Sequence, residues 1–280
     1  MIQLFYYSGI YFFILFVQYF INYLFSKEKD ISIIKKNLLP AVTASLVIGS
    51  ILHLLYTNFE SFNSDILFYI FLSVTLYGYW FIINPLQNTL LSKQHQRNLE
   101  IENKLKKEGL NFKVFFTDEI STNAIATGII PFYKIIILAN NLKTSLNEKE
   151  LMAIVYHEIG HHKRKHILIM YFLNVIFLTI YLIGRASMDN FEFPNKFYEG
   201  ISVFCSGALF GLVVYYIPNK IMYFLEYDAD SFSSKKYNRE NIISALKSLD
   251  ILSEGKLTEG NINHPNLEKR IANLENLNTD

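Results

Sequence analysis

The chain has 280 residues, of which 51% are hydrophobic, and its formal net charge is only +1. Such an apolar composition argues against an ordinary soluble domain, and the small charge argues against a nucleic-acid partner, because there is no basic excess to neutralise phosphates. The single cysteine, Cys205, excludes an intrachain disulfide and a cysteine-ligated zinc site. We therefore expect the lipid bilayer to be a partner of this chain.

Five apolar segments without Asp, Glu, Lys or Arg are each about long enough to cross a hydrocarbon core of roughly 30 Å. They are Leu4 to Phe25, Leu38 to Tyr56, Ile66 to Ile83, Ile167 to Ile183 and Ile201 to Ile217. Buried helices of a large soluble core are the alternative, but they would need more polar surface than the intervening segments supply. We expect the first segment to be retained, since it lacks the basic start and the small-residue cleavage site of a signal peptide.

The distribution of lysines predicts how the spans are oriented, because cytoplasmic loops have an excess of Lys and Arg. The loop between the first two spans contains Lys27, Lys29, Lys35 and Lys36, whereas the loop Thr57 to Asp65 contains no basic residue. The larger soluble segments should then face the cytoplasm. Without disulfides or a presequence, we expect a multi-pass protein of a bacterial cytoplasmic membrane, with the endoplasmic-reticulum membrane as the alternative.

A small mixed domain is predicted after the third span. The polar run from Ser92 to Gly109 predicts a helix that ends at the glycine. Phe112 to Phe116 and Tyr133 to Leu138 are rich in aromatic and β-branched residues and predict two strands. The segment between these strands contains Gly128 and Pro131 and is typical of a turn.

The next predicted helix contains the residues with the clearest chemistry. Ser145 and Glu148 have the spacing of a capping box, and the helix should continue without a break into the fourth span. Residues 157–161 read HEIGH, an HExxH pattern that places His157 and His161 on one helical face, where both can bind one zinc ion. Glu158 would be the general base that takes a proton from zinc-bound water attacking a peptide carbonyl. A random match has a probability of roughly one per cent.

Glu226 and Asp230 are the candidate source of a third ligand. They stand four residues apart, so one can bind the metal while the other hydrogen-bonds a ligand histidine. Three protein ligands would leave one zinc position for water, as a catalytic site requires. A solvated acidic helix face is the alternative for these residues.

Two other histidines are not expected to be ligands. His162 and His166 are displaced from the face of the HExxH pair and, with the basic residues 163–165, fit an interfacial collar. His53 lies inside the second span, where it could line a cavity or bond a neighbouring helix, and it has no assigned role.

Several motifs together resemble a known family. Residues 157–166, HEIGHHKRKH, and the EYDAD run of residues 226–230 are similar to the membrane zinc proteases that include the HtpX-type heat-shock proteases and the CAAX prenyl endopeptidases, gluzincin-type enzymes with HExxH plus ExxxD. Residues 123–128, NAIATG, resemble the family's N-A-x-A segment beside the substrate-binding edge strand. His264-Pro265 followed by Arg270-Ile271 resembles its C-terminal H-P…R-I element. The resemblance covers about Lys93 to Leu277.

The resemblance implies roles for individual residues. Glu226 would be the third ligand of one zinc ion per chain, and Asp230 would hydrogen-bond a ligand histidine. Asn123 and Ala126 would lie near the substrate backbone, and His264 would lie near the developing oxyanion. From the residues alone, Asn123 is also ordinary turn chemistry, and the His-Pro pair is also the approach to a helix over residues 266–277.

The predicted fold is mainly α, a multi-pass membrane protein with about five transmembrane helices and a small α+β zincin-like catalytic domain. Its predicted parts are a three-helix membrane region (1–92), a catalytic region with the HExxH helix (93–166), a transmembrane hairpin (167–217) and a second catalytic region with the third ligand (218–280).

The leading hypothesis is a zinc-dependent endopeptidase that hydrolyses peptide bonds of membrane or membrane-associated proteins at the cytoplasmic face. One alternative is a proteolytic signal transducer that cleaves a dedicated regulator, since an antibiotic-sensing protease family also places HExxH after three spans. Another is an inactive zinc-binding scaffold, although the presence of Glu158 argues against it because this base is not needed to hold zinc.

Overall fold

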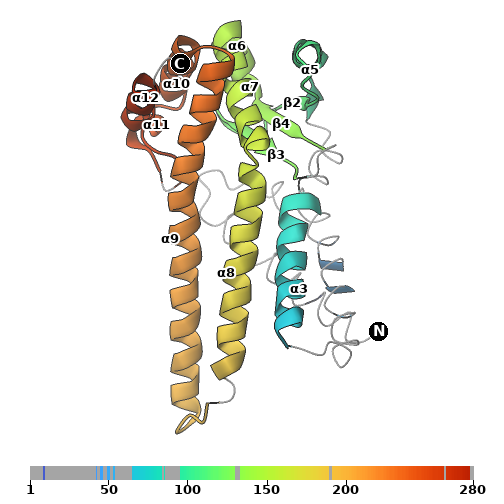
Figure 1. The fold of residues 1–280 in the computed structure, drawn as a ribbon, viewed down its shortest axis with the longest axis vertical. Helices are drawn as coiled ribbons and strands as arrows, with labels where there is room; N and C mark the ends of the chain where they lie inside the picture. Colours follow the sequence, from blue (N-terminus) through green and yellow to red (C-terminus); the bar gives the residue numbers. More distant parts are fainter. Residues whose placement is uncertain are drawn as a thin grey trace. The chain divides into compact units, whose positions relative to one another are not determined.

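The computed structural model describes residues 65–83, 95–129, 133–188, 191–261 and 263–277, together with a few isolated residues, namely 9, 42, 45, 46, 49, 50, 53 and 85. Two compact units divide the chain, one of residues 1–87 and 175–192 and one of residues 88–174 and 193–280. Figure 1 shows the described elements, which in chain order are α3 (Asp65–Gly78), η2 (Tyr79–Ile83), β1 (Gln96–Arg97), α5 (Leu99–Lys107), β2 (Lys113–Thr117), β3 (Ala124–Thr127), β4 (Ile135–Ala139), α6 (Asn140–Ser145), α7 (Glu148–Lys163), α8 (His166–Met188), α9 (Lys196–Lys236), α10 (Arg239–Leu252), α11 (Lys256–Glu259) and α12 (Leu267–Glu275).

Two of the described helices, α8 with 23 residues and α9 with 41 residues, are long and apolar enough to cross a membrane. They contain the fourth and fifth predicted spans. The third predicted span is α3 followed by the π-helical turn η2, and its apolar helix, residues 66–82, is shorter than these two. The first two predicted spans lie outside the described residues, apart from isolated positions, so the number of five remains a prediction.

A four-stranded sheet in the second unit has the order β1-β2-β4-β3. β2 and β4 are parallel, with Val114 beside Ile136, and β1 and β3 pair antiparallel on either side. The two predicted strands are confirmed as β2 and β4, with ends that differ by one or two residues. The segment between them is not simply a turn, because residues 124–127 form β3, an edge strand within the described part of the chain.

The predicted helix over residues 92–109 begins later than expected. Gln96 and Arg97 form strand β1, and α5 starts after Asn98, whose Oδ1 accepts a hydrogen bond of 2.9 Å from the backbone N–H of Ile101. The end is as predicted, because the chain turns at Gly109 with φ of +73°, a conformation that glycine adopts without strain.

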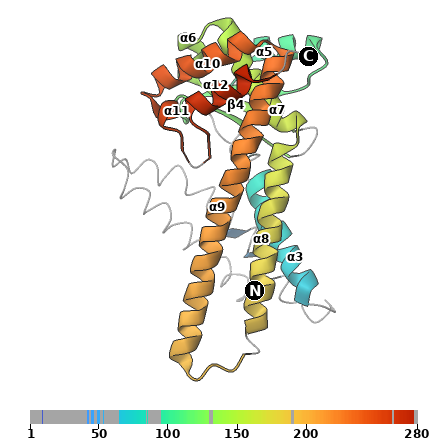
Figure 2. The ribbon, with the colours of Figure 1, turned by 60° about the vertical axis from the view of Figure 1, so that its left-hand side comes forward.

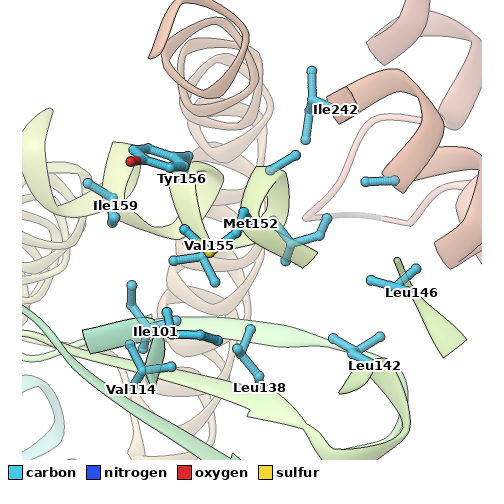
Figure 3. Packing of buried hydrophobic residues seen from close by; sticks show 14 of the residues in the cluster. Ile101, Val114, Leu138, Leu142, Leu146, Met152, Val155, Tyr156, Ile159 and Ile242 are labelled. Carbon is cyan, nitrogen blue, oxygen red and sulfur yellow. The ribbon is translucent and has the colours of Figure 1, made fainter. Parts of the chain in front are cut away.

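Helix α7 packs its apolar side chains against the sheet and against the C-terminal helices. Figure 3 shows Met152 and Val155 of α7 above Val114 and Leu138 of the sheet, with Ile242 of α10 on the other side of the helix. All five side chains are at most 5% exposed. Because α7 is covered on more than one side, its position is fixed by the core of the second unit.

The capping box of α7 lies two residues beyond the predicted one. Asn147 Oδ1 accepts a hydrogen bond of 3.0 Å from the Glu150 N–H, and Glu150 Oε2 accepts one of 3.1 Å from the Asn147 N–H. The predicted box of Ser145 and Glu148 is wrong, because Ser145 is the last residue of α6 and Glu148 is the first residue of α7.

The predicted continuous helix from the HExxH motif into the fourth span is also wrong. α7 ends at Lys163, and α8 begins at His166 after a turn in which Lys165 has φ of +61°. A lysine at positive φ is uncommon, since its Cβ crowds the backbone there. The break therefore changes the direction of the side chains that follow it.

The C-terminal part of α9 lies beside α7, and α10, α11 and α12 gather around that end of α9 (Figure 2). A buried hydrogen bond joins α7 and α9 directly, because Ser233 Oγ donates to the Ala153 carbonyl at 2.7 Å. This contact sets the register between α7 and α9 at the level of the HExxH motif.

Candidate metal centre

Three side chains with nitrogen or oxygen ligand atoms meet where α7 packs against α9. His161 Nε2 lies 3.2 Å from His157 Nε2 and 3.3 Å from Glu226 Oε1, and His157 Nε2 lies 3.5 Å from Glu226 Oε2. Atoms that bind a tetrahedral zinc ion at about 2.0–2.1 Å are about 3.3 Å from one another. The three buried side chains therefore have the separations and the donor types that one zinc ion requires.

The buried carboxylate of Glu226 favours a cation at this place. Burial alone would raise the pKa of Glu226, but hydrogen bonds from His157, His161 and His264 hold it well below its ordinary value. Glu226 Oε2 is buried, with His264 Nδ1 at 3.2 Å, His157 Nε2 at 3.5 Å and the guanidinium nitrogen Nη2 of Arg270 at 3.5 Å. An ionised carboxylate in such surroundings requires a positive charge close by.

His157 shows the same preference for positive charge. Burial alone would lower its pKa, but its interactions with Asp230 and Glu226 raise the pKa of His157 to about 10. Its Nδ1 lies 2.9 Å from Asp230 Oδ1, so Nε2 is the nitrogen that faces the other two ligand atoms. A proton on this ring and a metal ion would compete for the same site.

Asp230 joins His157 to a buried arginine. Arg270 Nε donates to Asp230 Oδ2 at 2.8 Å, and Arg270 Nη2 donates to Asp230 Oδ1 at 2.6 Å. Asp230 is 0% exposed and Arg270 is 6% exposed. This two-point ion pair fixes the Asp230 carboxylate, which in turn contacts His157. The resemblance of residues 264–271 to the H-P…R-I element did not predict this role of Arg270.

Glu158, the predicted general base, is next to His157 on α7 and is buried. Burial lowers the pKa of Arg270, but the neighbouring carboxylates of Asp230 and Glu226 raise it above its ordinary value. The carboxylate of Glu158 is also close enough to the guanidinium to raise this pKa, by a smaller amount. The predicted base, the predicted ligands and Asp230 thus belong to one cluster.

His264 reaches the same cluster from the loop before α12. Its Nδ1 lies 3.2 Å from Glu226 Oε2, and its side chain is 41% exposed. The loop is held by Asn261, whose Oδ1 accepts from the His264 N–H at 2.9 Å and whose carbonyl accepts from the Tyr223 hydroxyl at 2.6 Å. The structure therefore places a partly exposed imidazole at the rim of the buried ligand group.

Asn123 and Ala126 lie at the exposed edge of the sheet and not among the ligands. The Asn123 side chain accepts a hydrogen bond of 2.9 Å from the Ala124 N–H, which is the turn chemistry expected from the residue type. Ala126 lies within β3 and pairs with Ile136 of β4. Any contact of these residues with a substrate would involve the side of β3 that pairs with no strand among the described residues.

The predicted collar is wrong for two of its members, because His162 and His166 are both buried. His162 Nε2 lies 3.1 Å from the Ile135 carbonyl, which attaches α7 to the sheet. His166 lies against His161, a contact that the expectation of a continuous helix did not allow.

Comparison with known proteins shows similarity to a family of peptidases. Residues 85–278 match the sequence profile of peptidase family M48. Protease HtpX of Haemophilus influenzae strain PittEE is 30% identical over 179 residues, covering 55% of this chain and 63% of the relative. Protease HtpX of Actinobacillus pleuropneumoniae serotype 5b is 27% identical over 180 residues, covering 55% of this chain and 62% of the relative. The matches thus span less than two thirds of either relative.

A solved structure supports the fold independently of close sequence similarity. The crystal structure of S. mikatae Ste24p superposes with a TM-score of 0.65 and covers 86% of this chain and 66% of that protein, at 22% sequence identity. The mainly helical fold with a small mixed sheet is therefore shared with that protein.

Proposed function

The chain belongs to peptidase family M48, and we propose that it is a zinc-dependent endopeptidase that hydrolyses peptide bonds of membrane or membrane-associated proteins. The observation that supports this most directly is the meeting of His157, His161 and Glu226, whose two histidine Nε2 atoms are 3.2 Å apart and lie 3.5 Å and 3.3 Å from the two carboxylate oxygens of Glu226. This group stands beside Glu158, a carboxylate that is not one of the three proposed ligands.

Each residue of the cluster has a part in the proposed reaction. A zinc ion held by the three ligands would polarise the scissile carbonyl and acidify a water molecule. Glu158 would accept the proton of the attacking water and deliver it to the leaving amine, so that the proton is conserved through the cycle. Asp230, held by Arg270, would keep His157 in the tautomer that directs Nε2 toward the metal.

His264 would stabilise the negative charge that develops on the carbonyl oxygen. Its ring lies at the rim of the cluster, 3.2 Å from Glu226 Oε2, and is exposed enough to meet a substrate. A donor of this kind contributes about 2.7–4 kcal/mol to transition-state stabilisation in other hydrolases.

The substrate would bind along β3. This strand pairs with β4 on one side only within the described residues, and the side chain of Ile125 is 38% exposed. The unpaired backbone groups of an edge strand can bind an extended peptide as an additional strand. Asn123 and Ala126 would then lie next to the peptide backbone.

A membrane location is supported by the two long apolar helices that adjoin the cluster. α8 begins five residues after His161, and the apolar part of α9 ends at Ile217, nine residues before Glu226 and about 14 Å along the helix. The cluster would therefore lie near the membrane surface. The lysines of the first predicted loop favour the cytoplasmic side.

The test compares the wild type with Glu158→Gln, both purified as the full chain in detergent. Zinc per chain is measured together with cleavage of an unfolded reporter protein. We expect both proteins to hold one zinc ion and only the wild type to cleave, since glutamine has nearly the same shape as glutamate but cannot accept the proton.

Two other outcomes would point elsewhere. If both proteins hold zinc and neither cleaves the reporter, a dedicated substrate or an inactive scaffold becomes the better explanation. If the wild type holds no zinc under conditions in which it is folded, the assignment of the metal centre is wrong.

A further inference from the structure

His166 has a defined partner for each of its ring nitrogens. Its Nδ1 lies 3.1 Å from His161 Nδ1, and its Nε2 lies 3.0 Å from Asp228 Oδ2. The ring of His166 is 3% exposed, whereas the Asp228 side chain is 42% exposed and also lies 3.5 Å from Arg164 Nε. A chain of contacts therefore leads from the surface through His166 to His161.

The break between α7 and α8 makes this contact possible. In a continuous α-helix, residues five apart are rotated by about 140° around the axis, so their side chains diverge. Here the helix stops at Lys163, Lys165 adopts φ of +61°, and His166 turns back toward His161. A non-glycine residue at positive φ persists only where its surroundings hold it, and such residues often occur at functional sites.

The orientation of His161 determines which ring nitrogens of His161 and His166 must be protonated. Its Nε2 faces His157 and Glu226, so its Nδ1 points away from the ligand group toward His166. A neutral histidine that offers the Nε2 lone pair to a metal has its proton on Nδ1. His161 can donate that N–H to His166 only if His166 Nδ1 is unprotonated and accepts. The proton of His166 is then on Nε2, which donates to Asp228 Oδ2.

We propose that His166 and Asp228 are positioning residues for His161, which they hold in the Nε2-facing tautomer and orientation required to bind the metal. This inference rests on the proposed function, because it assumes that His161 is a ligand. The arrangement is the counterpart of Asp230 on His157, so the outer nitrogen of each ligand histidine lies close to a second polar side chain, at 2.9 Å for His157 and 3.1 Å for His161. Such partners orient the ring and increase its basicity toward the metal.

The decisive measurement is the zinc dissociation constant of the purified full chain, obtained by competition with a chromophoric chelator, together with the visible absorption of the Co²⁺-substituted protein. His166→Phe retains the ring volume and removes both nitrogens. His166→Asn retains an acceptor near the position of Nδ1. His162→Phe is the matched control, since the His162 ring is also buried but its Nε2 lies 3.1 Å from the Ile135 carbonyl oxygen instead of facing a ligand histidine.

We expect His166→Phe to weaken zinc binding by roughly 10–100-fold and to alter the Co²⁺ spectrum, as the loss of a ligand's hydrogen-bond partner does in other metal sites. His166→Asn should recover most of the affinity. His162→Phe should unfold at a lower temperature but keep the wild-type zinc affinity and Co²⁺ spectrum. A purely structural role of His166 would make His166→Phe behave like this control.

Asp228→Ala provides a second test that does not disturb the core, because Asp228 is partly exposed. It should weaken zinc binding in the same direction as His166→Phe, by a smaller factor. If both variants bind zinc as tightly as the wild type and show its Co²⁺ spectrum, the positioning role is wrong and the metal centre stands. If the wild type itself binds no zinc, the positioning role and the proposed metal centre are both wrong.

Discussion

Gly160 of α7 lies so close to Ala229 of α9 that a β-carbon at position 160 would come within 3.1 Å of the Ala229 Cα and 3.3 Å of its carbonyl oxygen. The same atom would come within 3.2 Å of the Phe232 Cβ. Two of the three obstacles are backbone atoms, which cannot move aside without moving α9. The glycine thus sets the spacing between the helix with the two proposed histidine ligands and the helix with the proposed third ligand.

Gly160→Ala should separate the helices and weaken both folding and metal binding. Overpacking of this kind costs about 1–3 kcal/mol, more than the gain of up to about 1 kcal/mol from replacing a helical glycine. The expected result is a lower unfolding temperature together with weaker zinc binding, measured by thermal unfolding and chelator competition. Gly211→Ala in α9 is the control, because a β-carbon at position 211 would have no neighbouring atom within 4 Å among the described residues. Equal behaviour of the two variants would contradict the close-contact explanation.

Arg270→Leu should destabilise the protein strongly. It leaves the carboxylate of Asp230 buried without its two-point partner, and breaking a buried ion pair from one side costs about 3–5 kcal/mol. Arg239→Leu is a suitable comparison, since Arg239 donates one hydrogen bond to the Leu277 carbonyl and its loss should cost about 0.5–1.5 kcal/mol. Chemical unfolding of both variants in the same detergent would measure the difference, and similar losses would show that the Arg270 pair contributes little.

Local patterns were sufficient for the parts of the site that are local in the chain. His157 and His161 meet because residues four apart share a face of any α-helix, and β2 and β4 form where β-branched and aromatic residues cluster. The local pattern did not identify Glu226 as the ligand, because the spacing of Glu226 and Asp230 allowed either residue to bind the metal. The resemblance to the protease family favoured Glu226, and in the structure its oxygens face both histidines.

Contacts between distant positions could not be predicted in this way. Asp230 and Arg270 are 40 positions apart and meet only because α12 packs against α9. His166 was expected on a continuous helix, and nothing in the sequence marks Lys165 as a residue of positive φ. The capping box was misplaced because Ser145 and Asn147 are both polar cap residues followed by a glutamate three positions later, a local ambiguity that folding resolves.

Removal of the metal should lower the unfolding temperature of the wild type. A zinc ion at the proposed centre would bind the folded state in preference to the unfolded chain, and ligand at about 100 times its dissociation constant stabilises a fold by about 2.7 kcal/mol. Treatment with a strong chelator should therefore reduce the unfolding temperature, and added Zn²⁺ should restore it. Glu226→Gln should respond much less to either treatment, because one of the three ligands has lost its charge. An unchanged unfolding temperature after verified loss of zinc would contradict a contribution of the metal to folding.

Acid should destabilise the start of α7 through Glu150. Burial alone would raise the pKa of Glu150, but hydrogen bonds from Ser244, from the Asn147 N–H and from Ser248 hold it below its ordinary value of 4.5. The Ser244 and Ser248 hydroxyls donate to Glu150 Oε1 at 2.6 and 2.9 Å and so attach α10 to α7. Each such bond to a charged group contributes about 1.5–3 kcal/mol.

The sign of the pH effect follows from the lowered pKa. The unfolded chain binds a proton at Glu150 more readily than the folded chain does, so the stabilisation is complete above about pH 4.5 and is lost as the pH falls through the folded-state pKa. Unfolding temperatures of the wild type and Glu150→Gln, measured from pH 6 to pH 3, should differ most at pH 6 and converge toward pH 3. A difference that stays constant over this range would show that ionised Glu150 is not the group responsible. Ser244→Ala should reduce the difference at pH 6, since it removes the hydrogen bond that lowers the pKa most.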